Sequence, residues 1–292
     1  NETKEVLEAK QQVSKKFKRT DMDFIVYFPW KRSQALERIN SFIEEKFENF
    51  GPYQDAIVAD QDFLWHSVIS AALNISIIQP MEVINKILEQ KGNMASKEGF
   101  IRQILGWREW SRYCYEYYYD LMVGKNFFNS KGKLSKIWYD ADEDLSDPML
   151  NTISRAWRTG YLHHIERLML IANFMTILRV EPDEMYKWFM EFAVDSYDWV
   201  MVNNVYGMGS YSDGGVTTTK PYISSSAYVI RMSNYKKGLW SKSWDGLYRL
   251  FIKENLPLLK DNPRMSMTLR SVKKPTDEEL ELVDEYNKLY LK

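Results

Sequence analysis

The sequence predicts an all-α fold for this chain of 292 residues. Almost every periodic segment places apolar residues three or four positions apart, which is the spacing of one helix face. Runs that alternate apolar and polar residues, as half-buried strands do, are almost absent. The apolar fraction of 45% and the charged fraction of 27% are ordinary for a globular protein, and the chain is long enough to bury a sizeable core.

The expected helices follow one another along the chain. The helix that begins at Ser33 starts with a plausible N-cap, and the one at Pro80 starts with proline in the first turn, where it is tolerated. The segment 97–119 has apolar or aromatic residues on most faces, which predicts a deeply buried helix. The predicted helices are 33–47, 62–73, 80–90, 97–119, 154–178, 182–200 and an acidic terminal helix at 275–292.

Three other segments lack this helical pattern. Residues 1–21 are polar and mixed in charge, and we interpret them as a connector or an exposed helix. Residues 125–148 include an acidic patch and are expected to form a surface loop with a short helix. Residues 202–226 hold four of the thirteen glycines and a threonine-rich stretch. A loop of that length inside a compact domain is usually functional.

The composition limits the class of protein. The single cysteine, Cys114, excludes an internal disulfide and a four-thiolate metal site, and it favours a reducing, cytoplasmic compartment. The first twenty residues show no signal-peptide pattern. The longest apolar stretch, 168–178, is too short to span a bilayer, so we expect a soluble protein without a membrane partner. The ten tryptophans fit either a large core or stacking and relay surfaces.

The net charge of −1 conceals a basic segment. Between Lys220 and Lys274, twelve Lys and Arg stand against three acids, so this segment carries 12 − 3 = +9 and the remainder about −10. A basic segment on a near-neutral chain is typical of a surface that binds a polyanion, because phosphate contacts supply most of the sequence-independent affinity. A merely solvated surface would show the same pattern, and the residues leave both interpretations open.

Two of the three histidines, His163 and His164, are adjacent. Arg167 follows them by four and three positions, so a guanidinium and at least one imidazole are expected on one helix face. This group favours a ligand or substrate site, with a satisfied core or surface histidine as the alternative. No metal site is expected, because no recognised zinc spacing is completed.

Other polar and aromatic residues stand at suggestive spacings. Asp195 lies 28 residues after Arg167 and opens a run rich in Asn and Gly. Gln103 and Trp107 share a helix face, with helix burial as the alternative reading. Small residues around position 70 fit either hydroxyl donation to a phosphate near a helix terminus or close helix packing.

Five motifs stand in one order along the chain. They are His66-Ser67-x-x-Ser70-x-x-Leu73-Asn74, Phe100-Ile101-Arg102-Gln103-x-x-Gly106-Trp107-Arg108, Tyr161-x-His163-His164-Ile165-x-Arg167-Leu168-Met169, Asp198-Trp199-Val200-Met201-x-x-Asn204-Val205-x-Gly207-Met208 and Asp213-Gly214-Gly215-x-x-x-Thr219-Lys220-Pro221-Tyr222-Ile223. In this order they resemble the photolyase/cryptochrome superfamily, specifically its bacterial branch that includes the (6-4) photolyases. The resemblance runs from about Phe24 to Arg264. It implies a helical FAD-binding domain at 22–274, between a connector or terminal helix at 1–21 and a C-terminal helix at 275–292.

The resemblance also implies roles for individual residues. Ser67 and Ser70 would contact the FAD phosphates, and Arg167 and Asp195 would form the salt bridge beside the isoalloxazine. The other positions implied to bind FAD are Leu73, Gln103, Trp107, Arg108, His163, Met201 and Asn204. The positions implied to touch the lesion or the DNA backbone are His163, His164, Lys220 and Tyr222. Trp188 matches the first ring of an electron-transfer route.

The function that the resemblance implies is light-driven repair of UV-damaged DNA by a monomeric enzyme. Photoexcited reduced FAD would pass an electron to a pyrimidine dimer flipped from the duplex. His163, His164 and Tyr222 favour the (6-4) photoproduct over the cyclobutane dimer, with His164 giving or holding a proton. The alternatives are a cryptochrome-like blue-light receptor that binds FAD without repair, and an FAD-binding remnant with a structural role.

Three features depart from the family pattern. Related bacterial enzymes hold an iron–sulfur cluster through four cysteines, but the matching stretch 235–244 has none, so no cluster is expected. The position expected opposite flavin N5 is Met201, whose apolar side chain has no exchangeable proton to donate. No stretch matches the family's α/β antenna domain, so an antenna chromophore is not expected in this chain; the domain was removed, or the form is naturally compact.

Overall fold

The protein is all-α, as the sequence predicts. The computed structural model describes residues 3–17 and 27–292, and within them it contains helices and isolated bridges but no sheet. The predicted boundary between 21 and 22, and the start of the motif resemblance near Phe24, lie outside the described residues. Among the described helices, none combines the length and the apolarity that crossing a membrane requires.

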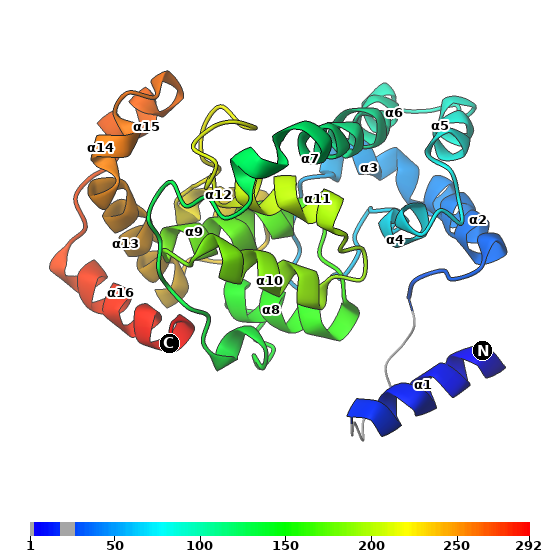
Figure 1. The fold of residues 1–292 in the computed structure, drawn as a ribbon, viewed down its shortest axis with the longest axis horizontal. Helices are drawn as coiled ribbons and strands as arrows, with labels where there is room; N and C mark the ends of the chain where they lie inside the picture. Colours follow the sequence, from blue (N-terminus) through cyan, green and yellow to red (C-terminus); the bar gives the residue numbers. More distant parts are fainter. Residues whose placement is uncertain (1–2, 18–26) are drawn as a thin grey trace.

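Figure 1 shows α9 and α10 near the centre, with α2 to α7 on one side and α13 to α16 on the other. The α-helices of the first half are α1 (Lys4–Phe17), α2 (Arg32–Ser41), α3 (Phe47–Tyr53), α4 (Ser70–Asn74), α5 (Pro80–Leu88), α6 (Met94–Ile101) and α7 (Glu109–Met122). Those of the second half are α8 (Pro148–Thr159), α9 (Asn173–Ile177), α10 (Pro182–Phe192), α11 (Asp198–Val202), α12 (Ser226–Met232), α13 (Leu239–Glu254), α14 (Leu256–Leu259), α15 (Ser266–Ser271) and α16 (Asp277–Tyr290).

Wider π-helical turns interrupt several of these helices. They are η1 (Phe42–Lys46) between α2 and α3, η2 (Arg102–Arg108) between α6 and α7, η4 (Glu166–Ala172) before α9, and η5 (Asn203–Gly209) after α11. A π turn rotates the following side chains relative to a regular helix, and such turns are frequent at functional sites. Two short 3₁₀ turns, η3 (Lys136–Trp138) and η6 (Pro263–Met265), complete the described elements.

The predictions for 33–47, 80–90 and 275–292 are confirmed, whereas the helix at 62–73 is wrong in most of its length. α4 begins only at Ser70, after a loop in which Leu64 and Val68 have φ of 39° and 54°. This left-handed backbone cannot continue an α-helix. Deep burial of 97–119 is also wrong, because Tyr113 and Tyr117 are 45% and 65% exposed on its outer side.

The two long helices predicted at 154–178 and 182–200 are each broken. Gly160, with φ of 66°, ends α8, and the helix resumes at His164. α10 ends at Phe192, where the Ser196 hydroxyl donates to the carbonyl of Phe189, 2.7 Å away. These breaks place two short turns next to each other, since the backbone N–H of Val194 donates to the carbonyl of Gly160 at 3.0 Å.

The loop predicted at 202–226 starts later than expected. η5 continues the helix of α11 to Gly209, so the irregular part begins at Ser210. The paired asparagines are compatible with this helix because their side chains find partners inside it and next to it. The amide of Asn204 donates to the carbonyl of Val200 at 2.7 Å, and the amide of Asn203 donates to the hydroxyl of Ser111 at 3.3 Å.

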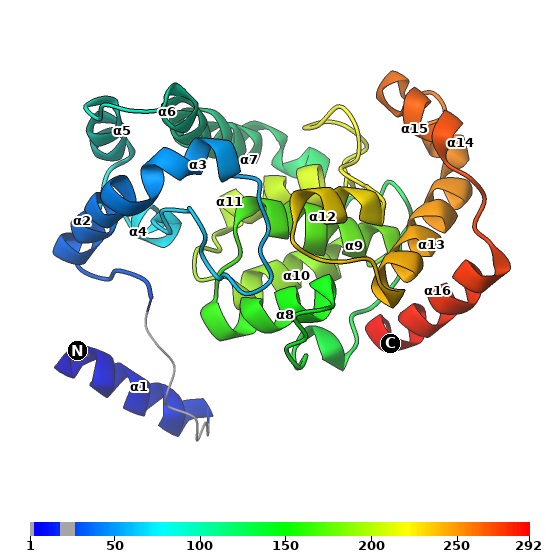
Figure 2. The same cartoon turned by 180° about the vertical axis from the view of Figure 1, so that it is seen from behind.

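The largest core joins the central helices to the C-terminal ones. The expected surface loop 125–148 and its short helix are present, but Trp138 in that helix is fully buried. Its indole N–H donates to the carbonyl of Tyr290 at 2.9 Å, which fastens the loop to the end of α16. Figure 2 shows α13 and α16 side by side, in agreement with their mutual packing. Trp138, Trp188 and Trp244 are at most 1% exposed, so these rings belong to the core.

The basic segment spreads over the surface from the loop after η5 to the residues that follow α15. Lys242 pairs with Glu278 at 2.8 Å and Arg249 with Glu279 at 2.5 Å, so the acidic helix α16 neutralises part of it. The remaining basic residues of this segment are exposed. They are Lys220, Arg231, Lys236, Lys237, Lys253, Lys260, Arg264, Arg270, Lys273 and Lys274.

Candidate functional site

A cavity of about 640 Å³ lies among α4, η2, η4 and η5. Its volume is within the range of sites that bind cofactors and other small molecules. Three of the π turns contribute to its wall, which agrees with the tendency of such turns to occur at functional sites. Twelve of the residues singled out in the sequence line it: Ser67, Ser70, Leu73, Gln103, Trp107, Arg108, His164, Arg167, Asp195, Met201, Asn204 and Tyr222.

An ion pair between Arg167 and Asp195 lies in the wall of this cavity. Arg167 Nη1 is 2.9 Å from Asp195 Oδ1, and Arg167 Nη2 donates to Oδ2 at 3.1 Å. The Arg167 Nε–H donates to the carbonyl of Leu162 at 2.6 Å, which fixes the plane of the guanidinium. The two helix breaks make the pair possible, because Asp195 occupies the turn between α10 and α11 while Arg167 lies in the first turn of η4. A guanidinium and a carboxylate are thereby both held facing the cavity.

Hydrogen bonds extend this pair towards α4 and η2. The Ser70 hydroxyl donates to Asp195 Oδ2 at 2.6 Å, and the Asn74 amide donates to the backbone carbonyl of Asp195 at 2.9 Å. Arg108 Nη1 donates in turn to Asn74 Oδ1 at 2.9 Å. In this structure the single hydroxyl proton of Ser70 is donated to the Asp195 carboxylate, and its contact with a phosphate stays a prediction. Through these two hydrogen bonds, Asn74 positions both Asp195 and Arg108.

The cavity has chemically distinct walls. Arg108 lies with its guanidinium carbon 4.7 Å from the centre of the Trp199 ring, which combines a cation and an aromatic surface. Trp107 is 40% exposed although it lines the cavity, so its ring is available to a ligand. Met201 is 2% exposed and closes the apolar side. Such a cavity suits a large ligand with both planar and anionic parts.

Within the part of the chain that the structure describes, one oxygen of the Asp195 carboxylate is held by the ion pair alone. Among the described residues, no group donates a hydrogen bond to Asp195 Oδ1, although this oxygen is buried and Arg167 is its ionic partner. A buried carboxylate oxygen is costly without a donor. A ligand with an N–H group at this point would satisfy it. The residues present therefore fit the flavin that the motif resemblance implies, with Arg167 and Asp195 on the polar side and Met201 on the apolar side.

His164 lies at the edge of the cavity and His163 lies behind it. His164 Nε2 is 2.9 Å from Asp55 Oδ1, and its side chain is 40% exposed. His163 precedes the helix that His164 begins, is 2% exposed and does not line the cavity. The prediction that the two histidines stand on one continuous helix is wrong, because Gly160 ends α8 and the chain re-enters a helix only at His164.

His66 joins these two histidines from the loop before α4. Its ring stacks on His163 with centroids 4.6 Å apart and planes 12° apart. Burial, followed by the neighbouring His164, lowers the pKa of His66 to about 3, and burial also lowers the pKa of His163 well below its ordinary value. Both rings are therefore neutral at physiological pH.

Lys220 and Trp188 do not reach the cavity. Lys220 is exposed on the loop after η5, two residues from Tyr222. Trp188 is fully buried, and its indole N–H donates to the carbonyl of Trp138 at 2.8 Å. Its ring lies behind Phe192, with centroids 4.5 Å apart, and the Arg167 guanidinium lies 5.8 Å from the Phe192 ring. The ring of Trp157, which is 38% exposed, also lies next to Trp188, with centroids 6.5 Å apart.

Several residues of the site were given no role from the sequence. His66 and Asn74 stand in the first motif beside Ser67, but nothing in their spacing links them to residues about a hundred positions later. Asp55 lies in an irregular loop and carries no sequence signal at all. Trp199 belongs to the fourth motif, where its aromatic side chain was a possible signal for a stacking partner.

Comparison with known proteins gives relatives for most of the chain, although no protein-family model matches it. The (6-4) photolyase of Agrobacterium fabrum is 33% identical over 253 residues, which are 82% of this chain and 50% of that protein. Two uncharacterized proteins of Acanthamoeba polyphaga mimivirus also match. R855 is 55% identical over 101 residues, 34% of this chain and 82% of that protein. R853 is 40% identical over 113 residues, 37% of this chain and 85% of that protein.

The fold has a counterpart among solved structures. A bacterial class III photolyase from Agrobacterium tumefaciens superposes with a TM-score of 0.51 and 17% identity, over 87% of this chain and 52% of that one. The chain thus spans about half the length of the photolyases that it matches. Homology over four-fifths of the sequence and the shared helical architecture lead to one conclusion. The chain belongs to the photolyase/cryptochrome superfamily.

Proposed function

We propose that the cavity binds FAD and that the chain acts in light-dependent repair of UV-damaged DNA. The observation that carries this proposal is the convergence of residues from 67 to 204 on one cavity around the Arg167–Asp195 pair. These are the positions that the motif resemblance assigns to FAD. Bound FAD would supply a light-driven electron donor, while the protein supplies orientation and electrostatics.

Each wall of the cavity has a defined task in this proposal. Asp195 Oδ1 would accept an N–H group of the cofactor, and the ion pair with Arg167 holds this carboxylate in position. Arg108 and the hydroxyl of Ser67 face the anionic part, where Arg108 supplies the positive charge. Leu73, Gln103, Trp107, Met201 and Asn204 enclose the remaining surface.

The lesion would enter beside His164 and Tyr222, which line the same cavity. The Asp55 carboxylate orients the His164 imidazole through the 2.9 Å contact with Nε2, leaving Nδ1 to give or hold a proton on the substrate. Lys220 and the exposed basic residues beyond it bind the phosphates on either side. The presence of His164 and Tyr222 favours the (6-4) photoproduct as the lesion.

Trp188 supports a route for electrons between the cavity and the surface. Phe192 contacts both Trp188 and Arg167, and the partly exposed Trp157 lies next to Trp188. We assign Trp188 to the resupply of electrons, as its match to the family position implies. Replacing Trp188 with Phe keeps the ring in the core and should slow light-driven reduction of the bound flavin without releasing it.

The test begins with the purified chain. Its absorption spectrum, before and after incubation with FAD, shows whether a flavin is held. The protein is then illuminated with oligonucleotides that carry either the (6-4) photoproduct or the cyclobutane dimer, and restoration of the bases is followed by chromatography, with a dark control. We expect a bound flavin and restoration of the (6-4) photoproduct in light alone. Failure to bind flavin under any condition would refute the proposal.

A matched variant separates binding from repair. His164→Ala should abolish repair of the (6-4) photoproduct while the flavin spectrum is retained, because His164 lies at the edge of the cavity and not between the charged pair. Asp195→Asn should instead weaken flavin binding itself, since it removes the charge that holds Arg167. Flavin binding without repair of either lesion would assign the chain to blue-light reception.

A further inference from the structure

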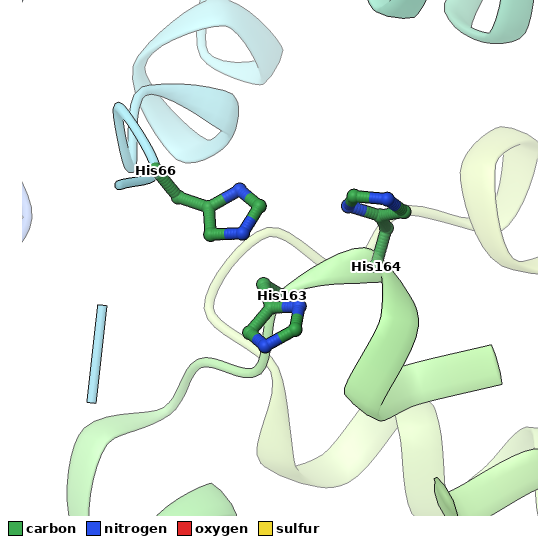
Figure 3. A group of neighbouring side chains, drawn as sticks. All are labelled: His66, His163 and His164. Atoms are coloured by element: carbon green, nitrogen blue, oxygen red, sulfur yellow. The ribbon is translucent and has the colours of Figure 1, made fainter. Parts of the chain in front are cut away.

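The three histidines of this chain, separated by up to 98 positions in the sequence, meet at one point. Each offers a ring nitrogen, and these nitrogens lie within 4.8 Å of one another. Figure 3 shows the imidazoles of His66, His163 and His164 arranged around a common space, each with a nitrogen directed to it. His66 comes from the loop before α4, His163 is the last residue before the helix that leads into η4, and His164 begins that helix.

Two of these imidazoles are buried and, within the described ranges of the chain, have ring nitrogens without hydrogen-bond partners. His66 Nε2 and both ring nitrogens of His163 have no hydrogen-bond partner among the described residues. His66 is 7% exposed and His163 is 2% exposed, so bulk water does not replace a missing partner. A buried nitrogen that makes no hydrogen bond loses its solvation without compensation and so destabilises the fold. Such groups call for a ligand that the protein atoms do not provide.

In each ring, the nitrogen that points away from the other two histidines lies near a carboxylate or a backbone group, and such groups orient metal-ligating histidines. His164 Nε2 lies 2.9 Å from Asp55 Oδ1, His163 Nε2 lies 3.5 Å from Glu166 Oε2, and His66 bonds to the backbone of Gln54. Metal-ligating histidines nearly always donate their second N–H to a carboxylate or a backbone carbonyl. This pattern leaves one nitrogen of each ring free to face the others, namely His66 Nε2, His163 Nδ1 and His164 Nδ1.

We propose that His66, His163 and His164 bind a divalent transition-metal ion, with Zn²⁺ as the preferred ion. Three neutral imidazoles are a recognised zinc ligand set, and a fourth position is then left for water or for another ligand. Because His66 and His164 both line the cavity, this fourth position opens towards its contents. Zinc–nitrogen bonds of about 2.0–2.1 Å in a tetrahedron place the nitrogens about 3.3 Å apart. The rings must therefore close by at most about 1.5 Å.

The sequence predicts no metal site because the recognised zinc motifs are short spacings of ligands that lie close together in the chain. His163 and Glu166 do not complete a zinc motif, and His66 is 97 positions before His163. The fold supplies the missing ligand by placing the loop before α4 against the start of η4. Metal binding here needs neither flavin nor DNA, so it goes beyond the proposed function. A metal-bound His164 cannot also exchange a proton with a lesion, which makes the metal-bound and repair-competent forms alternatives.

The test uses the full chain without a polyhistidine tag, stripped of metal with a chelator and dialysed. Titration with Co²⁺ as a spectroscopic probe should develop visible d–d absorption that saturates at one equivalent, and Zn²⁺ should displace it. His66→Ala and His164→Ala should each abolish the absorption. Asp55→Asn should weaken binding about 10- to 100-fold, as loss of an outer-shell partner does. Cys114→Ser is the matched control, since it removes the one thiol and should leave the spectrum unchanged.

A second measurement covers variants that fail to fold. In the unaltered protein with ¹⁵N-labelled histidine, Zn²⁺ should shift the ring nitrogens of all three residues together at one equivalent. Absence of saturable Co²⁺ absorption, or zinc-induced shifts confined to the exposed His164, would overturn the assignment. Neither readout involves flavin or repair, so a negative result here leaves the proposed function untouched, and a failure to bind FAD leaves the metal site untouched.

Discussion

At the scale of single residues, the buried pair Arg155–Glu166 shows how this fold tolerates charge in its core. The Arg155 side chain is 1% exposed and that of Glu166 is 0% exposed, and they form a direct salt bridge. Burial raises the pKa of Glu166 to about 7 even though Arg155 opposes this shift. The carboxyl group can therefore take up a proton if its partner is lost, whereas the guanidinium remains charged.

This asymmetry predicts unequal costs for breaking the pair from its two sides. Glu166→Gln leaves a buried guanidinium without its main partner and should lower the free energy of unfolding by about 3–5 kcal/mol. Arg155→Met should cost less, because Glu166 becomes neutral. Urea unfolding at pH 7 of both variants and of the double variant measures this. Equal costs of the two single variants would contradict the asymmetry, and strictly additive costs in the double variant would show that the pair is not coupled.

Cys114 gives a second prediction at this scale. It is fully buried, and burial raises the pKa of its thiol to about 11. Since the thiolate is the reactive form, the folded protein should resist alkylation by iodoacetamide at pH 8 and react fully in urea. The rate measured against urea concentration then reports unfolding. Fast labelling of the native protein at pH 8 would mean that this part of α7 opens locally.

At the scale of the element, the break between α8 and the histidine-bearing helix depends on Gly160. Its φ is 66°, and a Cβ at this position would lie 2.6 Å from Val194 Cγ2. Gly124, at the end of α7, has a φ of 69° but would have nothing within 4 Å of an added Cβ. The two glycines thus share a backbone conformation and differ in the space around them.

Alanine substitutions at these two glycines separate backbone strain from contact. Gly124→Ala should cost about 1–2 kcal/mol, which is the left-handed penalty alone. Gly160→Ala should cost about 1–3 kcal/mol more, because overpacking against the stiff Val194 is added. Denaturant unfolding followed by circular dichroism gives both numbers. If the two variants lose the same stability, the turn that carries Asp195 does not press on Gly160.

At the scale of the whole molecule, the C-terminal helix belongs to the main core. Tyr290 is 1% exposed, and its ring lies 5.6 Å from Trp138 and 5.0 Å from Phe174. Gly246 lets α13 pack closely against α16, because a Cβ at this position would lie 2.9 Å from the carbonyl oxygen of Glu279. The predicted segment 275–292 is thus a helix that completes the packing around α9 and α13.

This packing predicts that α16 unfolds together with the centre of the molecule. Tyr290→Ala should lower the free energy of unfolding by about 3–5 kcal/mol, as loss of a buried aromatic side chain does. Leu289→Ala, at a neighbour that is 44% exposed, should change it by less than about 0.5 kcal/mol. Thermal unfolding followed by both circular dichroism and tryptophan fluorescence checks this. Two separate transitions would mean that α16 folds on its own.

The sequence by itself determined the all-α class, several of the helices and the motif residues that line the cavity. These follow from periodicity and from motifs a few residues long, which are local properties of the chain. The sequence did not determine where the long helices break. The break at Gly160 is held by a hydrogen bond from Val194, which lies 34 positions later in the chain. The hydrogen bond from Ser196 to Phe189 forms only once the turn after α10 is in place.

Only the tertiary structure decided which side chains meet. Ser70 reaches Asp195 across 125 positions, and His66 reaches His163 across 97, and no local pattern specifies either contact. Trp188 lies behind Phe192 for the same reason, since its place depends on how α10 is docked onto the core. Contacts of this kind form only when burial of the apolar core offsets the entropic cost of closing the loops between them. That balance depends on the whole chain and not on any local segment.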